Sequence, residues 1–331
     1  MKPRARLTSS WPLLLAGLSA VALSGCDGVQ SVLSPDGVES ERVWTLFWVL
    51  TIGGSVIMVV VIILTWLAIA IRPRWLSTEA LVVGGGIIFP IVTLTALLGY
   101  GVMLMSAAAN TSANQPALEV SIRGEQWWWR VTYTAPDGTR IESANELRIP
   151  VGRPVRIALT SADVIHSFWV PRLAGKLDMI PGRTNVMTLV AKQAGVSRGQ
   201  CAEYCGGAHA LMSFYVVALP AAEFDTWLAK EASDAASQTE QAGGQMLFLS
   251  HGCGGCHAIR GTAAVGRIGP DLTHVGSRLS LAAAALPNDE QAFMRWIADN
   301  QHIKPTNRMP PFGIFSEAEL RSLARYLAAL K

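Results

Sequence analysis

Two long apolar segments set the strongest limit on how this chain can fold. Val43–Ile71 and Ala80–Ala109 contain no charged residue, and each is longer than the roughly 20 apolar residues with which a helix crosses a bilayer. A helix in the core of a soluble domain is the alternative, but such helices are shorter and have a polar face. Only 15% of the residues are charged, which also favours a membrane protein. We therefore expect a transmembrane hairpin.

The connection between the two segments predicts their orientation. Arg72 and Arg74 directly follow the first segment, and positively charged loops stay on the cytoplasmic side. Everything after residue 110 is then expected on the periplasmic, or outer, face of a bacterial inner membrane. The chain has no basic cluster that would indicate nucleic-acid binding.

The N-terminus has the pattern of a secretory signal. Basic residues at positions 2, 4 and 6 precede Trp11–Leu23, an apolar stretch too short to cross a membrane. Leu23–Cys26 resembles a bacterial lipobox, which predicts a lipoprotein-type signal peptide over residues 1–25 and lipidation of Cys26. Cleavage nearby with Cys26 left free is the alternative. Residues 26–42 would then form an N-terminal segment on the outer face.

Residues 115–220 have the pattern of an all-β domain. Short stretches rich in β-branched and aromatic residues alternate with turn-forming residues such as Pro136-Asp137-Gly138. This spacing fits a sandwich of the cupredoxin kind. Residues 221–242 are rich in alanine and charge and are expected as a helical tail or linker. The expected strands are Leu118–Arg123, Trp127–Thr134, Val155–Thr160, Val186–Val190 and Phe214–Leu219.

A cluster of metal-ligand residues lies near the end of this domain. Cys201 and Cys205 are followed closely by His209 and Met212. Thiolate, thioether and imidazole ligands together favour copper. One cysteine with a histidine and a methionine would suit a single copper ion. Two cysteines on one loop allow two bridged copper ions, provided that the chain supplies a second histidine.

His166 is the candidate for this second histidine. It lies in an apolar and aromatic segment upstream of the cysteines, and copper-binding β-sandwiches combine an upstream strand with a later ligand loop. A disulfide between Cys201 and Cys205 is the alternative, because a C-x3-C pair alone does not separate the two cases. His166 by itself would more often be a structural histidine of the core.

Residues 243–331 contain a second cofactor motif. Cys253 and Cys256 followed by His257 have the C-x-x-C-H spacing that attaches a c-type haem, with His257 bound to iron. A thioredoxin-like dithiol or half a zinc site is the alternative, but neither accounts for the histidine. Met309, followed by two prolines, is the predicted opposite ligand, and a methionine ligand raises the haem potential.

Other side chains of this unit are weaker candidates for the iron ligand. Met246 and Met294 lie in helical patterns and are expected in the core. His251 and His302 are expected at the surface. His274 lies in a segment similar to the cytochrome domains that are fused to oxidase subunits.

Together, these motifs resemble subunit II of the haem–copper cytochrome c oxidases, with a fused C-terminal class I cytochrome c domain. The resemblance rests on HSFWVP from His166, KLDMIPGRTN from Lys176 and the cysteine loop. It covers the chain from about the first span to about Pro220, and the cytochrome domain follows. The expected fold is a multidomain membrane protein with a two-helix transmembrane hairpin, an all-β cupredoxin-like sandwich and an all-α cytochrome c domain.

The resemblance implies a binuclear copper centre, CuA, and a role for each residue near it. Cys201 and Cys205 would bridge the two copper ions, and His166 and His209 would be the terminal ligands. Weak axial ligands would be Met212 and the backbone carbonyl of Glu203. The side chain of Glu203 would also help to hold a magnesium ion at the boundary with subunit I.

Further roles follow from the same resemblance. Trp127 would be the point at which electrons enter, although a tryptophan usually serves packing. Pro270 would offer its carbonyl to His257, and Arg278 would bind a haem propionate or remain solvated. Glu79 stands near the glutamate that serves proton uptake in many subunit II sequences. Because glycines at 84–86 replace the expected tryptophan region, we expect Glu79 to be an acidic cap at the membrane surface.

The two cofactors predict an electron-transfer subunit of a terminal respiratory oxidase. Electrons would pass from a soluble or membrane-bound cytochrome c to the haem, to CuA and then to subunit I. Subunit I, with subunit III beside it, would reduce O2 to water with proton translocation. The CuA subunit of a nitric oxide reductase complex and a membrane-anchored periplasmic copper carrier are the alternatives. Subunits of quinol oxidases lack the copper ligands that this chain has.

Overall fold

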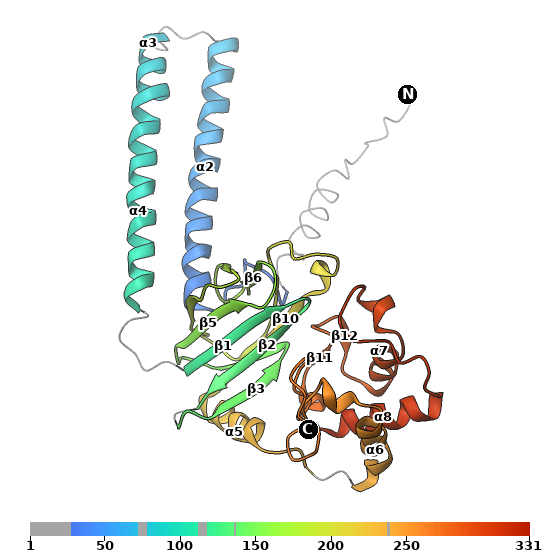
Figure 1. Cartoon of the computed structure of the whole chain (residues 1–331). Helices are drawn as coiled ribbons and strands as arrows, with labels where there is room; N and C mark the ends of the chain where they lie inside the picture. The colour runs from blue at the N-terminus through green and yellow to red at the C-terminus, as the bar shows by residue number, and fades with distance from the viewer. Residues whose placement is uncertain (1–27, 72–77, 112–117, 136, 237–238) are drawn as a thin grey trace, which may run out of the picture.

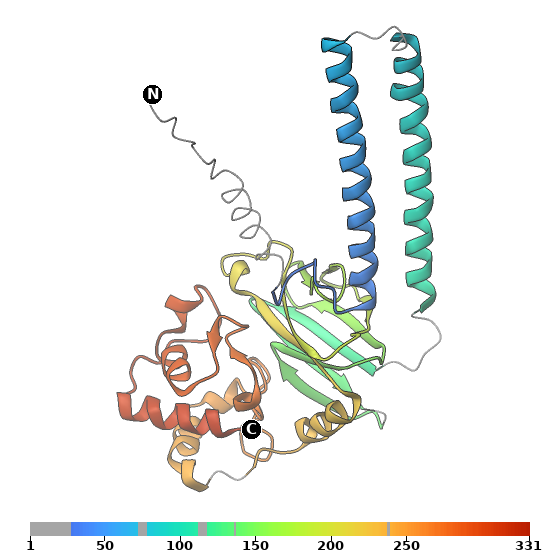
Figure 2. The same ribbon diagram turned by 180° about the vertical axis from the view of Figure 1, so that it is seen from behind.

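A computed structural model describes residues 28–71, 78–111, 118–135, 137–236 and 239–331 of the chain. The predicted signal peptide, the lipidation site Cys26 and the loop arginines Arg72 and Arg74 lie outside these residues. The described parts are a pair of long helices, a β domain in the middle of the chain and a small helical domain at the C-terminus (Figure 1, Figure 2).

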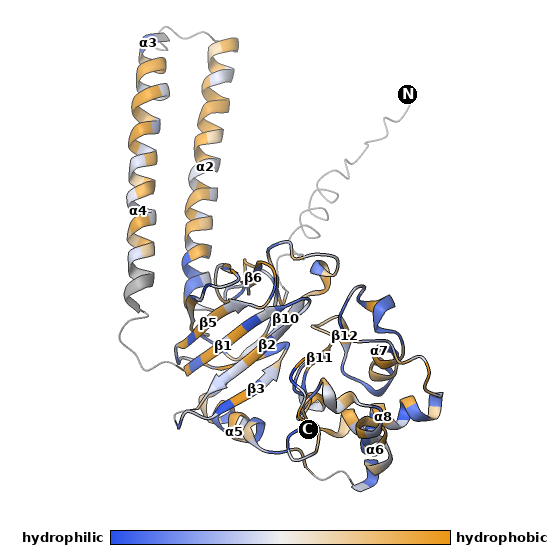
Figure 3. Ribbon diagram, viewed as in Figure 1, coloured by the Kyte–Doolittle hydropathy of each residue, from blue (hydrophilic) through white to orange (hydrophobic). Residues whose placement is uncertain are grey.

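The pair of helices forms the predicted hairpin. The first is α2 (Val38–Ala70), which begins before the expected Val43. The second consists of α3 (Thr78–Ala80), the wider π-helical turns of η1 (Leu81–Ile88), which contain the three glycines, and α4 (Phe89–Thr111). Both are apolar along most of their length (Figure 3). In each helix, the most apolar stretch of 18 residues has no buried residue. A lipid bilayer is the solvent that suits such surfaces.

The start of α2 is fixed to the β domain. The backbone N–H groups of Asp36 and Gly37 donate to the carbonyl of Arg172 at 2.7 and 3.1 Å, and the Ser40 hydroxyl donates to it at 2.6 Å. A Cβ atom on Gly37 would lie 2.2 Å from the Leu173 carbonyl oxygen, so only glycine permits this approach. The first helix therefore leaves the β domain at a defined point.

The β domain is a sandwich of two five-stranded sheets, in the orders β3-β2-β1-β5-β8 and β4-β10-β9-β6-β7. The pairs β1–β5 and β4–β10 are parallel and the others are antiparallel. All five predicted strands are present within one or two residues of their expected ends. The strands are β1 (Leu118–Glu125), β2 (Trp128–Thr134), β3 (Arg140–Ala144), β4 (Glu146–Pro150), β5 (Val155–Ser161), β6 (His166–Trp169), β7 (Leu177–Met179), β8 (Asn185–Leu189), β9 (Gly195–Cys201) and β10 (Ser213–Leu219).

Aromatic side chains fill the space between the sheets. The ring of Phe214 lies 4.9 Å from that of Trp129 and 4.8 Å from that of Phe168, measured between centroids. All three residues are buried, and aromatic pairs at such distances add to the stabilisation from their burial. Helix α5 (Ala221–Ala232), in the predicted helical tail, packs Phe224 against the same core.

The C-terminal domain packs three helices around its own core: α6 (Ala242–Ser250), α7 (Glu290–Ile303) and α8 (Glu317–Ala329). Helices α6 and α8 cross closely because a Cβ atom on Gly244 would lie 2.3 Å from the Ser322 carbonyl oxygen. A capping box formed by Ser316 and Glu319 begins α8. The all-α expectation holds except for the short pair β11 (Ser280–Leu281) and β12 (Leu286–Pro287).

Candidate metal centres

The cysteine loop is positioned by the strands on either side of it. Strand β6 pairs with β9 so that Phe168 lies opposite Cys201, which brings His166 near the end of β9. The loop returns to β10 directly after Met212, and the N–H of Cys201 donates to the Met212 carbonyl at 2.9 Å. The sandwich therefore brings an upstream strand to the later loop, as the sequence predicted.

All six predicted copper ligands lie in one cluster. The two cysteine sulfurs are 3.7 Å apart. Nδ1 of His166 lies 3.8 Å from Cys201 Sγ, and Nδ1 of His209 lies 3.5 Å from Cys205 Sγ. The Met212 sulfur is 3.9 Å from Cys205 Sγ, and the Glu203 carbonyl oxygen is 3.2 Å from Cys201 Sγ. Each cysteine therefore has one histidine and one weaker donor beside it.

The cysteines have the properties of metal ligands rather than of a disulfide. A disulfide would hold the sulfurs at about 2.05 Å, and both side chains are buried and unbridged. The hydrogen bond between the two thiol groups lowers the pKa of Cys201 and raises the pKa of Cys205. The pair thus shares one proton, which a bound metal would displace. Two soft thiolates with two imidazoles and a thioether fit copper.

Sequence reasoning missed two side chains beside this cluster, Asp163 and Gln126. Asp163 Oδ1 lies 2.8 Å from His166 Nε2, a contact that the D-x-x-H spacing could have suggested. The Cys205 carbonyl accepts hydrogen bonds from Gln126 Nε2 at 2.8 Å and from Trp127 Nε1 at 3.0 Å. The tryptophan and the amide therefore help to fix the loop.

Trp127 lies at the copper loop, but it is not placed as the strand pattern predicted. It was expected as the first residue of a strand, but it directly precedes β2. Its ring packs on Gly206, where an added Cβ atom would lie 3.1 Å from Cζ2. Only 7% of Trp127 is exposed, so little of the ring could meet an external protein.

The Glu203 side chain points toward a lysine. Its carboxylate lies 3.8 Å from Lys176 Nζ, and both groups are about half exposed. Within the part of the chain that the structure describes, the one group of three or more metal-ligating side chains is His166, Cys201 and Cys205. The contacts of Glu203 therefore add no support for the expected magnesium ion.

The C-x-x-C-H motif has the geometry of a haem attachment site. Both of its cysteines are unbridged and half-buried. His257 Nδ1 lies 2.8 Å from the Pro270 carbonyl, the contact expected from the sequence, which leaves Nε2 as the nitrogen for iron. Burial lowers the pKa of His257, so the imidazole is in the neutral form that binds metals.

Glycines keep the backbone close to this motif. A Cβ atom on Gly269 would lie 2.5 Å from His257 Cε1, and one on Gly266 would lie 2.5 Å from the backbone of Cys256. The segment from 266 to 270 can therefore pack directly against the motif. It is one of the two segments that would hold the haem.

Met309 lies in a segment that is fixed by its backbone. The N–H of Met309 donates to Asn307 Oδ1 at 2.9 Å, and its carbonyl accepts from Gln301 Nε2 at 3.0 Å. The side chain packs against the apolar core of the domain. Arg278, also buried, donates to the Asp271 carbonyl at 2.6 Å, and its Nε atom has no partner among the described residues. A buried guanidinium with a free donor suits the carboxylate of a haem propionate.

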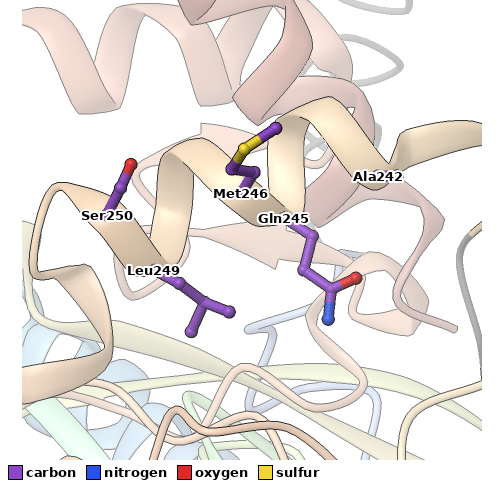
Figure 4. Close-up of a pocket in the computed structure, with 5 residues that line it drawn as sticks. All are labelled: Ala242, Gln245, Met246, Leu249 and Ser250. Atoms are coloured by element: carbon purple, nitrogen blue, oxygen red, sulfur yellow. The ribbon is translucent and has the colours of Figure 1, made fainter.

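The weaker candidates for the iron ligand in this domain are partly exposed and partly packed in the core. His251 and His302 are exposed and Met294 packs against the core, as expected. Met246 was predicted in the core, but it is 67% exposed. It faces outward on α6 because Gly244 and Phe248 form the buried face of this helix. Met246 lines an open pocket that has no charged side chain, together with Ala242, Gln245, Leu249 and Ser250 (Figure 4).

Segments close to the two candidate centres are in contact at the boundary between the domains. Arg130 stacks over Trp128 at 4.6 Å, and its guanidinium donates to the carbonyl of Arg267, beside the haem motif, at 2.9 Å. A Cβ atom on Gly207, in the cysteine loop, would lie 3.3 Å from Thr306 Oγ1. The N–H of Ser213 donates to the Ala283 carbonyl at 3.2 Å. The helical domain therefore rests on the cysteine loop.

Comparisons with known proteins assign a family to each of the two domains outside the membrane. Residues 134–219 match the family described as "Cytochrome C oxidase subunit II, periplasmic domain", and residues 241–331 match the cytochrome c family. Cytochrome c oxidase subunit 2 of Bacillus subtilis is 31% identical, over 98% of this chain and 99% of that protein. The chain belongs to the cytochrome c oxidase subunit II family.

Two further relatives are of the same kind. Cytochrome c oxidase subunit 2 of Alkalihalophilus pseudofirmus is 38% identical, over 64% of this chain and 61% of that protein. A crystal structure of the periplasmic domain of subunit II of cytochrome oxidase from Bradyrhizobium japonicum is 32% identical. It aligns with 35% of this chain and 95% of that chain, at a TM-score of 0.33. Subunit II is a part of an oxidase complex, and the domains of this chain imply copper and haem as its cofactors.

Proposed function

We propose that this subunit II passes electrons from a cytochrome c donor through its own haem to a binuclear CuA centre. From there, electrons would reach subunit I, which reduces O2 with proton translocation, with subunit III as a further partner. The observation that carries the proposal is that the two segments that would hold the haem both contact the copper domain.

The first of these segments lies beside the haem motif. Its Gly266 packs on the backbone of Cys256, and the carbonyl of Arg267 accepts a hydrogen bond from Arg130. The second segment ends in Met309, and its Thr306 lies against Gly207 of the cysteine loop. The segments next to His257 and Met309, which would hold the haem, therefore both contact the copper domain.

The copper domain supplies a rigid set of donors. Cys201 and Cys205 would bridge the metal pair, His166 and His209 would be its terminal ligands, and Met212 and the Glu203 carbonyl would be weak axial donors. When bound, the copper pair and the haem supply one-electron redox chemistry. Because these donors already lie close together and are largely buried, they would need to move little when the copper pair gains or loses an electron.

Trp127 is the side chain that we propose for electron transfer into the copper loop. Its Nε1 donates to the Cys205 carbonyl at 3.0 Å, so it is coupled directly to a bridging ligand. Since its ring is almost fully buried, its source of electrons would be the fused cytochrome domain rather than an external protein. The external donor would then deliver electrons to the cytochrome domain.

The same proposal includes the position of the chain in the cell. Both redox domains would lie on the periplasmic face of the inner membrane, with α2 and the second helix spanning it and a lipid on Cys26 as a further anchor. Glu203 would complete a magnesium site only with groups from subunit I.

The test is electron transfer within the purified full chain. It should contain about two copper ions for each haem. After rapid reduction of the haem, absorbance should show haem reoxidation together with copper reduction, at a rate that is independent of protein concentration. Cys201→Ser should keep a haem that stays reduced. A rate proportional to protein concentration would contradict transfer within one chain, and a chain free of copper would overturn the proposal.

A further inference from the structure

The two terminal histidines of the copper site have different surroundings. His166 is fully buried, and its Nε2 lies 2.8 Å from Asp163 Oδ1. His209 is half-exposed, and no hydrogen bond to its Nε2 is found among the described residues. Apart from Cys205, the ring contact found for His209 among the described residues is with Tyr204, which is 76% exposed, at 5.8 Å between centroids. Among the described residues, His166 therefore has a carboxylate bonded to its second ring nitrogen and His209 does not.

The Asp163 carboxylate is itself held in place. Its Oδ2 accepts from the N–H of Gln126 at 2.8 Å, and its Oδ1 accepts from the N–H of Val164 at 2.8 Å. Its side chain is only 13% exposed. Two backbone donors therefore fix the carboxylate in the orientation that meets His166.

We propose that Asp163 is a positioning residue that makes His166 the stronger of the two histidine ligands. By accepting the proton on Nε2, Asp163 keeps Nδ1 as the free nitrogen, and Nδ1 faces Cys201. A carboxylate behind a histidine orients the ring and raises its basicity as a metal ligand. This inference rests on the copper site proposed above, and it adds an asymmetry between the two halves of that site.

The cytochrome domain reaches the same carboxylate. Arg308, the residue before Met309, has its guanidinium 3.9 Å from Asp163 Oδ2. The segment that carries the predicted iron ligand therefore places a positive charge next to the carboxylate that holds a copper ligand. Arg308 is 70% exposed, so solvent and salt weaken this interaction. Its effect should be smaller than that of Asp163.

These charges predict opposite shifts of the copper reduction potential. The negative charge of Asp163 stabilises the oxidised, more positive form of the centre, so Asp163→Asn should raise the potential. The positive charge of Arg308 opposes this effect, so Arg308→Gln should lower the potential, and more so at low ionic strength. In the Asp163→Asn background, the shift caused by Arg308→Gln should shrink.

The experiment uses the full chain with both cofactors. Redox titration at the copper absorption gives the potential, and electron–nuclear double resonance gives the nitrogen couplings of the two histidines. Asp163→Asn should raise the potential and weaken the coupling of one histidine. Copper binding by the metal-free chain should weaken by about 10- to 100-fold. Asp178→Asn, on the neighbouring strand β7, is the matched control, since Asp178 pairs with Ser167 through the backbone alone.

The outcomes separate this inference from the function on which it rests. A wild-type chain without a CuA spectrum would overturn the proposed function. A normal wild-type spectrum with an Asp163→Asn potential and couplings equal to those of Asp178→Asn would overturn only the positioning role. If Asp163→Asn fails to retain copper, the test is the copper reduction potential of Arg308→Gln at low salt. A potential equal to or higher than that of wild type would contradict the inference.

Discussion

The copper site and the haem site are built in different ways. In the β domain, six donors from β6, the end of β9 and the loop after it already lie within 4 Å of a neighbouring donor. In the helical domain, His257 and Met309 are held by separate backbone contacts, and no hydrogen bond among the described residues joins their two segments. The protein fold thus brings the copper ligands together by itself, whereas the haem would connect two segments that no hydrogen bond joins among the described residues.

The largest effect should come from breaking the preformed site. In Cys201→Ser, the hydroxyl cannot replace a bridging thiolate, so we expect loss of the mixed-valence copper signal with an intact haem spectrum. Electron paramagnetic resonance and metal analysis measure both. Cys253→Ser is the reciprocal variant, which should impair haem attachment and leave copper in place. A copper signal that survives in Cys201→Ser would contradict the binuclear site.

A second variant tests the haem side of the comparison. In Met309→Ala, the haem stays attached through Cys253 and Cys256 but loses its axial thioether. We expect a change from a low-spin to a high-spin or weakly ligated spectrum and a lower haem potential. Met246→Ala is the control, because this methionine is 67% exposed on α6. A low-spin, methionine-ligated spectrum in Met309→Ala would require another ligand.

The sequence predicted the parts of the molecule that depend on local patterns. The two apolar spans and the five strands follow from hydrophobic periodicity and turn chemistry. The copper-loop cluster could be predicted because four of its side chains lie within twelve residues of one another. His166 required the family resemblance, since nothing in its own segment separates a metal ligand from a buried core histidine.

The sequence did not predict features that arise when distant segments meet. The bond from Asp163 to His166 is local, and its D-x-x-H spacing was visible, but that spacing indicates a contact only once the ring orientation is known. Arg308 meets Asp163 only because the helical domain rests on the cysteine loop. Met246 was misplaced because an apolar residue in a helix does not by itself show which face is buried. Long-range docking leaves no periodic signal in the chain.

Lys304 lies where the two domains meet, and its expected effect is on stability and not on either cofactor. It is 2% exposed, and its ammonium group donates to the Ala282 carbonyl at 3.0 Å. Ala282 and the next two alanines have positive φ angles of 54°, 60° and 60°, which are uncommon for residues with a Cβ atom. Burial lowers the pKa of Lys304 from 10.5 to about 7.

This shift predicts a pH dependence of stability with a definite sign. Between about pH 7 and 10.5, the unfolded chain keeps the proton on Lys304 and the folded chain loses it, so the free energy of unfolding should rise with pH. The slope from one group cannot exceed about 1.4 kcal/mol per pH unit. Below pH 7 both states are protonated, and the contribution becomes constant.

Lys304→Met isolates this contribution, because methionine has a similar length and does not titrate. Chemical denaturation of the loaded chain should show a stability difference between wild type and Lys304→Met that rises in favour of wild type from about pH 7 to 10. Lys230→Met, at an exposed position on α5, should show no such trend. A difference that stays constant with pH would mean that Lys304 is not desolvated by docking of the helical domain, and that the boundary between the two sites is looser than its contacts indicate.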